Sequence, residues 1–180
     1  AACRVDVLPP IDAKARAVVG LDLASKVDVA AAVVVWEWEG KYVIKPYFWI
    51  PESRVSSNDA YRSWVEQGHM RTTPGETIDF SVIEADLEAI CGENNVWAVP
   101  YDRLQAVQFA TRMTERSIPM VEFAQTVSKM SEPMKEIQAL VIEHKIVHDG
   151  NPVMSWMVSN VVVVEDRHEN IFPRKLRKEN

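Results

Sequence analysis

The segment that most constrains how this chain folds is an apolar run that ends in an acid and is followed, after a short polar turn, by a second apolar run. Residues 18–21 lead into Asp22, residues 24–28 form the turn, and residues 29–36 are again apolar. The pattern indicates two neighbouring strands, with a carboxylate at the end of the first strand, at the edge of a sheet. Such a carboxylate serves two chemistries. It binds a divalent metal for phosphodiester hydrolysis, or it helps to clamp nucleotide phosphates in kinases and ATPases of the actin and sugar-kinase type.

The composition is that of one compact domain without a membrane span. With 180 residues and 47% hydrophobic residues, the chain can bury a core without disulfides. No apolar run approaches the roughly 20 residues that cross a bilayer. Cys3 and Cys91 lack metal-ligand spacing, so a reducing cytoplasm is expected. The formal net charge of -6 argues against a chain that binds nucleic acid tightly by itself, although residues 174–178 are basic.

Three strands early in the chain form a meander. We predict them over residues 17–23, 29–38 and 41–50, with Glu39-Gly40 as a tight hairpin turn between the second and the third. Residues 1–16 contain Pro9-Pro10 and no periodic pattern, which indicates a linker or arm, so the folded domain is predicted over residues 17–180. Residues 51–79 are weakly patterned, with a short helix expected at about 61–66, and their role stays open.

Helices and strands alternate in the rest of the chain. Capping residues predict helix starts at Ser81 with Glu84, at Asp102 with Gln105, at Ser131 and at Asn151-Pro152. Short strands are predicted at residues 96–101, 119–123 and 161–164. The apolar positions expected to face the core are Ile83, Leu87 and Ile90 in the first helix, Ala106, Phe109, Ala110 and Met113 in the second, and Ile137, Leu140 and Val141 in the third.

This order of elements predicts a ribonuclease H-like α/β fold. Its mixed central sheet is antiparallel in the meander, parallel beyond it, and flanked by helices. If the strand at 96–101 lies beside the first strand, Asp22 and Asp102 sit at the carboxyl ends of neighbouring strands, about 4.8 Å apart. Hard divalent cations such as Mg²⁺ prefer carboxylate oxygens. The sequence therefore predicts a shared cation site at Asp22 and Asp102.

Each acid also has a purely structural interpretation. Asp102 suits a helix N-cap, Asp22 an Asx turn, and Asp28 an ordinary turn before the second strand. The pair His148-Asp149 is a candidate ligand or base, but in a turn such a pair more often forms local hydrogen bonds.

Short motifs follow one another in a specific order between about residue 17 and residue 175. They are Gly20-Leu21-Asp22-Leu23-Ala24-Ser25 with Asp28; Trp64, Gly68 and Thr73-Pro74-Gly75 with Ile78-Asp79; Tyr101-Asp102-Arg103; Val121-Glu122-Phe123-Ala124-Gln125; Met130-Ser131 with Met134-Lys135-Glu136; and His148-Asp149-Gly150-Asn151-Pro152 with Trp156 and Asn160. Together they resemble the nuclease domain of the large terminase subunits of tailed phages, which are DNA-packaging motors.

This resemblance implies a metal-dependent endonuclease that cuts concatemeric double-stranded viral DNA at the start and the end of genome packaging. It carries Asp22 and Asp102 over as catalytic, metal-binding acids for two Mg²⁺ or Mn²⁺ ions, and Asp28 as a supporting acid. Arg174 and Lys175 are candidate DNA contacts in the basic end of the chain. The family's third metal-binding acid follows this basic region, where Glu179 is the only acid in residues 171–180 and does not match it.

The same resemblance predicts what surrounds this domain: the rest of its polypeptide, its partners and its location. We expect a fragment that is truncated at its C-terminus and lacks the ATPase domain of the same polypeptide, with Pro9-Pro10 left from the interdomain linker. The expected partners are double-stranded DNA, the terminase small subunit and the portal, and the expected location is the cytoplasm of the infected bacterial host.

Two other functions stay open. An actin- or sugar-kinase-like phosphotransferase shares the first strand, turn and strand, but it needs glycine-rich phosphate loops. The chain has only six glycines and neither a P-loop nor a dinucleotide-binding glycine motif, which argues against that class. The other is a non-catalytic, nuclease-like docking module, which the unmatched third acid favours.

Overall fold

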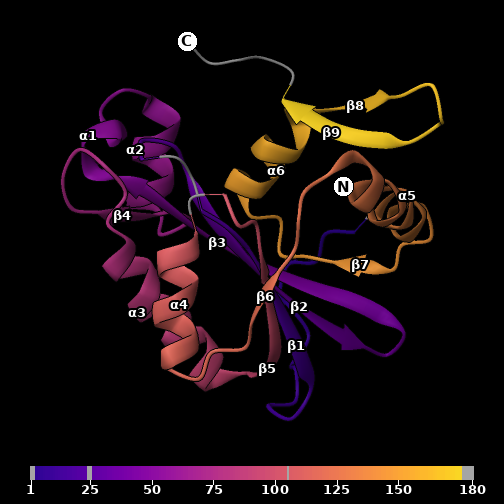
Figure 1. Ribbon diagram of the computed structural model, residues 1–180, viewed down its shortest axis with the longest axis horizontal. Helices are drawn as coiled ribbons and strands as arrows, with labels where there is room; N and C mark the ends of the chain where they lie inside the picture. Colours follow the sequence, from indigo (N-terminus) through magenta and orange to yellow (C-terminus); the bar gives the residue numbers. More distant parts are fainter. Residues whose placement is uncertain (1–2, 24–25, 105, 176–180) are drawn as a thin grey trace.

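The computed structural model describes residues 3–23, 26–104 and 106–175 and is built around one mixed sheet (Figure 1). The strands of this sheet lie in the order β4-β3-β2-β1-β5-β6, and β7 pairs with β3 as well. Their bounds are β1 (Arg16–Asp22), β2 (Ala30–Trp38), β3 (Lys41–Pro51), β4 (Arg71–Thr73), β5 (Asn95–Tyr101), β6 (Met120–Glu122) and β7 (Ile146–Val147). A second sheet is the hairpin of β8 (Val161–Glu165) and β9 (Ile171–Lys175).

Strands β1 to β3 form the predicted antiparallel meander. Along β1 the residues Ala17, Val19 and Leu21 are buried, while their neighbours in the strand are not, as expected of alternating side chains. Glu39 and Gly40 have φ angles of 50° and 72°, the left-handed conformation that a two-residue hairpin turn requires. The meander and its turn are therefore confirmed.

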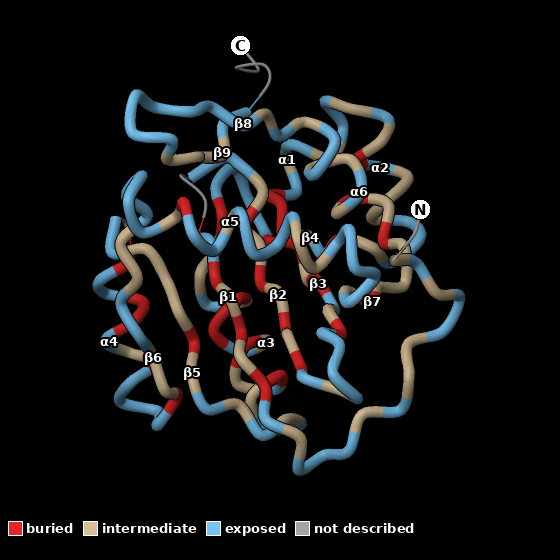
Figure 2. Tube along the Cα trace, turned by 90° about the vertical axis from the view of Figure 1, so that its right-hand side faces the viewer, coloured by how far each residue is buried: buried red, intermediate tan, exposed pale blue. Residues whose placement is uncertain are grey.

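The parallel half of the sheet also follows the prediction. β5 pairs in parallel with β1, on the side opposite β2, and β6 pairs in parallel with β5. In Figure 2 the strands β6, β5, β1, β2 and β3 lie side by side, with the buried residues concentrated along them. The predicted mixed sheet flanked by helices is thus confirmed.

Helices cover both faces of the sheet. On one face, α3 (Phe80–Glu93) and α4 (Val107–Glu115) contribute Leu87 and Phe109 to the main core cluster. On the other face, α2 (Asp59–Glu66) and α6 (Pro152–Ser159) pack on β3, where Ile50 belongs to a second buried cluster. The remaining helices are α1 (Glu52–Val55) and α5 (Val127–Ile142).

The predicted starts of α3 and α4 are wrong. α3 begins at Phe80, and its N-cap is Asp79, whose carboxylate accepts from the Ser81 backbone N–H at 2.9 Å; Ser81 and Glu84 form no capping box. α4 begins at Val107 without a side-chain cap. Asp102 instead accepts from the Leu104 N–H at 3.1 Å, which is an Asx turn before the helix; Gln105 lies outside the described residues. The buried stripes predicted for α3 and α4 are confirmed.

The prediction for α5 is also wrong in its start and in its buried face. The helix begins at Val127 with Thr126 as its N-cap, so Ser131 lies inside it. Ile137 and Val141 are 50% and 44% exposed rather than inward. The reason is that α5 packs mainly against β9, a strand that the sequence analysis did not predict. By contrast, the Asn151 cap of α6 is confirmed, because its Oδ1 accepts from the Val153 N–H at 2.9 Å.

Two segments flank the central strands: residues 51–79 and the residues before β1. The weakly patterned residues 51–79 contain α1, α2 and β4, and β4 extends the sheet beside β3. Before β1, Val5 and Leu8 pack against the core, and the Val5 N–H donates to the His148 carbonyl at 2.9 Å. A domain boundary at residue 16 stays a prediction. None of the helices in the described residues is long and apolar enough to cross a bilayer.

Candidate active site

The two predicted acids meet where β1 and β5 end. In the parallel register Leu21 pairs with Tyr101, so Asp22 and Asp102 are the next residues at the same edge of the sheet. Adjacent strands lie about 4.8 Å apart, which brings the two carboxylates within reach of one cation. The structure therefore brings together the two acids that the sequence singled out.

The charge environment of Asp22 reflects this placement. The residue is exposed at the surface, but enough protein surrounds its carboxyl group that burial raises its pKa above the ordinary 3.8. The ammonium group of Lys175 lowers the pKa of Asp22, and the negative charge of Asp102 raises it. Two like charges held together in this way favour the binding of a cation between them.

The acids border a hollow of about 330 Å³ on the sheet surface. Gly20 of β1 and Ala31 and Val33 of β2 line it, together with residues at and after the ends of β5 and β6 and at the start of α5. Phe123 and Gln125, which follow β6, were missed as site residues by the sequence analysis. Their signal was their position at the end of the predicted strand at 119–123 and just beyond it, the place where a parallel sheet gathers its functional residues.

The other predicted site residues, Asp28, Arg174 and Lys175, do not line this hollow. Arg174 and Lys175 are exposed at the end of β9, and Lys175 is close enough to Asp22 to affect its pKa. Asp28 is exposed in the turn before β2 and does not line the hollow. A supporting role for Asp28 and a DNA contact for Arg174 stay predictions.

The donor set suits a hard divalent cation. Mg²⁺ is typically held by one or two carboxylates, with waters and substrate phosphate oxygens completing its coordination. Asp22 and Asp102 offer such a pair. Within the described ranges, no three His, Cys, Asp or Glu side chains gather as a metal-binding group. Glu179 lies outside those ranges, so a cation held here by described residues takes its remaining ligands from water and substrate.

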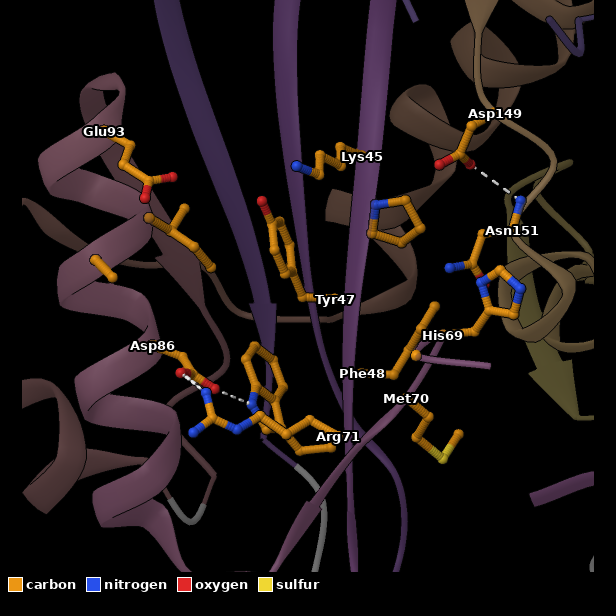
Figure 3. A pocket seen from close by; sticks show the side chains of 15 residues that line it. Lys45, Tyr47, Phe48, His69, Met70, Arg71, Asp86, Glu93, Asp149 and Asn151 are labelled. Atoms are coloured by element: carbon orange, nitrogen blue, oxygen red, sulfur yellow. Dashed lines mark hydrogen bonds and ion pairs between the residues drawn. The ribbon is translucent and has the colours of Figure 1, made fainter. Parts of the chain in front are cut away.

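A larger cavity of about 450 Å³ lies elsewhere, between α3, β3 and the turn before α6 (Figure 3). The acids Asp86, Glu93 and Asp149 line it, and Asp86 and Asp149 already accept hydrogen bonds. Asp86 accepts from Trp49 Nε1 at 2.6 Å and pairs with Arg71, and Asp149 accepts from the Asn151 N–H at 3.0 Å. We therefore assign the candidate active site to the smaller hollow, where two strand ends present acids together.

The turn at His148-Asp149 forms local hydrogen bonds, as its structural interpretation predicts. His148 Nδ1 accepts from the Gly150 N–H at 3.0 Å, in addition to the bond to Asp149 just described. Both side chains thus order the turn that leads into α6.

Comparison with known proteins identifies related chains. Residues 5–180 match the family described as "Terminase large subunit, endonuclease domain". The large terminase subunit of Enterobacteria phage HK97 is 33% identical over an alignment of 177 residues that covers 94% of this chain and 34% of that protein. Protein YmfN of Escherichia coli K12 is 29% identical over 179 residues, covering 91% of this chain and 39% of YmfN.

Solved structures agree with the sequence matches. The crystal structure of the HK97 large terminase superposes with a TM-score of 0.84 at 29% identity, covering 96% of this chain and 37% of that one. The large terminase nuclease from the thermophilic phage G20c has a TM-score of 0.62 at 12% identity, covering 92% and 75%, and shares the fold. The chain spans between a third and two fifths of the curated relatives it matches.

Proposed function

Because this chain belongs to the family of terminase large subunit endonuclease domains, we propose that it cuts concatemeric double-stranded viral DNA during genome packaging. The observation that carries the proposal is the convergence of Asp22 and Asp102 at the ends of paired strands β1 and β5. Membership in a nuclease family argues against the phosphotransferase considered above, which the shortage of glycines also disfavours.

In this proposal Asp22 and Asp102 are the catalytic acids, and their carboxylates hold the divalent cations, two Mg²⁺ or Mn²⁺ ions. When bound, such cations lower the pKa of a water for in-line attack on phosphorus and stabilise the departing oxygen. The products are a 5′-phosphate and a 3′-hydroxyl. Burial raises the pKa of Asp22, and the positive charge of Lys175 opposes that rise, which favours the ionised carboxylate that a cation requires.

DNA binding in this proposal relies on Arg174 and Lys175 and on parts outside this chain. A formal net charge of -6 is unfavourable for holding a polyanion alone. We therefore assign substrate positioning to the ATPase domain of the same polypeptide, the terminase small subunit and the portal. The setting is the cytoplasm of the infected bacterial host.

The direct test is metal-dependent nicking of supercoiled plasmid by three variants. Asp22→Asn and Asp102→Asn keep the size of the side chain and remove the charge, so each should lower the rate by at least about a hundredfold. Asp59→Asn is the matched control, since Asp59 is 97% exposed on α2 and should leave the rate unchanged. Nicking at the unmodified rate by both active-site variants, with folding verified by circular dichroism, contradicts the proposal.

A non-catalytic docking module is the second candidate, and the two-acid site without a described third acid favours it. The two functions differ in metal binding. A nuclease should bind Mn²⁺ in a calorimetric titration and lose that binding in Asp22→Asn, whereas a docking module has no need to bind Mn²⁺ at all.

A further inference from the structure

Gly20 occupies a place in β1 where a glycine has no evident structural purpose. Glycine in a strand interior weakens the strand by about 0.5–1 kcal/mol relative to alanine. Such a residue is usually explained by a left-handed backbone or by a close neighbour. Gly20 has no φ in the left-handed range, and a Cβ built on it would meet no heavy atom within 4 Å. Neither the backbone nor the packing of the described residues requires glycine here.

The space beside Gly20 belongs to the hollow at the candidate active site. Gly20 pairs with Val33, Asp22 pairs with Ala31, and all four residues line the hollow. Because side chains alternate along a strand, Gly20 and Asp22 share one face, about 6.6 Å apart along β1. A side chain at position 20 would therefore project into the hollow next to the catalytic acid.

We propose that Gly20 leaves room for the deoxyribose of a nucleotide that flanks the scissile phosphate. This inference rests on the proposed nuclease function. A cation held by Asp22 and Asp102 fixes the phosphate beside them, and the sugar is the group joined to that phosphate by a single ester oxygen. The floor formed by Gly20, Ala31 and Val33 is apolar and matches the apolar edge of a deoxyribose ring.

The sugar fits this place better than the base does. In duplex DNA a base is stacked and paired, and turning it outward costs several kcal/mol. The deoxyribose lies on the outside of the duplex and reaches the protein surface without that cost. A glycine that exists for the close approach of a ligand also accounts for the weakened strand interior.

The test compares ligands that share a phosphate and differ in what is attached to it. With Mg²⁺ present, binding is followed by NMR for inorganic phosphate, the 5′- and 3′-phosphates of a tetrahydrofuran abasic analogue, and dAMP. We expect one of the abasic phosphates to bind about tenfold tighter than inorganic phosphate, and dAMP to add nothing further. Equal binding of phosphate and both abasic phosphates overturns the proposal, as does a gain that requires the base.

Two substitutions locate the effect at position 20. Gly20→Val should bring the abasic phosphate down to the affinity of inorganic phosphate, while the affinity for inorganic phosphate itself stays the same. Gly20→Ala, which adds only one methyl group, should lose part of the gain. Since both replace a glycine in a strand, their melting temperatures should be unchanged or higher. A Gly20→Val variant that binds the abasic phosphate like the unmodified chain contradicts the proposal.

The control is Gly92→Ala on α3, where an added Cβ also meets no atom within 4 Å but which does not line the hollow. It should leave all affinities unchanged. The failure of this inference is distinct from failure of the nuclease function. If Mg²⁺ and phosphate bind and Asp22→Asn removes that binding, but the sugar contributes nothing, only the role of Gly20 is wrong.

Discussion

Two parts of this molecule are packed very differently. The sheet part, formed by β1, β2, β5, α3 and α4, buries Leu87 and Met113 completely. In the same part the buried carboxylate of Glu84 forms ion pairs with Arg112 Nη2 at 2.6 Å and with Arg116 Nη2 at 3.1 Å. The hairpin part, formed by α5, β8 and β9, has only one buried residue in α5. Burial therefore falls from the sheet part to the hairpin part, where Figure 2 shows mostly exposed and intermediate residues.

This difference bears directly on the candidate active site. Asp22 and Asp102 stand on the sheet part, whereas Lys175, which lowers the pKa of Asp22, comes from the hairpin part. We infer that loosening the hairpin changes the charge around the acids without displacing them.

The largest expected effect is on stability and compares one leucine with one isoleucine. Leu87→Ala removes a fully buried side chain from the sheet part and should lower the free energy of unfolding by about 2–5 kcal/mol. Ile137→Ala, at a residue 50% exposed on α5, should cost no more than about 0.5 kcal/mol. Urea unfolding measures both, and equal costs would show that the two parts are packed alike.

An intermediate effect concerns the contact that joins β9 to α5. Ser131 is buried, and its Oγ accepts from the Ile171 N–H at 3.1 Å. Ser131→Ala leaves that N–H without its partner and should cost about 1 kcal/mol. Hydrogen exchange should speed up at Ile171 and stay unchanged at Val19 in β1. Faster exchange in both places would mean that the two parts unfold together.

The smallest expected effect depends on pH and concerns Asp22 with metal removed by a chelator. Burial raises the pKa of Asp22 in the folded chain above its ordinary 3.8, so the folded state binds more protons than the unfolded state between the two values. Stability contributed by this group is present at low pH and is lost as the pH rises through the folded pKa. Asp22→Asn should therefore stabilise the chain at pH 7, by no more than about 1 kcal/mol because solvent screens the charge.

The same substitution should have no effect near pH 3, where the carboxyl is largely protonated in both states. Thermal unfolding at both pH values checks this prediction. A variant that is less stable than the unmodified chain at pH 7 would show that the charge of Asp22 is stabilising rather than destabilising.

The sheet part was predictable from sequence because its signals are local and agree with one another. Alternating burial in β1 and the Glu39-Gly40 turn set the register of the meander. Once the strand at 96–101 is placed beside β1, the meeting of Asp22 and Asp102 follows from parallel pairing alone. The start of α3 was misjudged because Asp79 and Ser81 are both good capping residues, and sequence does not rank them.

In the hairpin part the strand predicted at 161–164 is confirmed as β8, whereas β9 was not predictable for a physical reason. β9 contains Pro173 and two basic residues, a composition that does not signal a strand. Without β9, the apolar residues of α5 were assigned to the core, although the helix packs on the hairpin instead. Gly20 was likewise not singled out as a site residue, because what distinguishes it is the empty space beside it.

The central claim is that Asp22 and Asp102 act as one cation site, and a double-mutant cycle on metal binding tests it most directly. Mn²⁺ is titrated by calorimetry into the unmodified chain, Asp22→Asn, Asp102→Asn and the double variant. A shared site predicts that each single substitution weakens Mn²⁺ binding at least about tenfold and that the second adds little to the first. Mn²⁺ affinity that survives either single substitution, or two losses that simply add, would contradict a shared site.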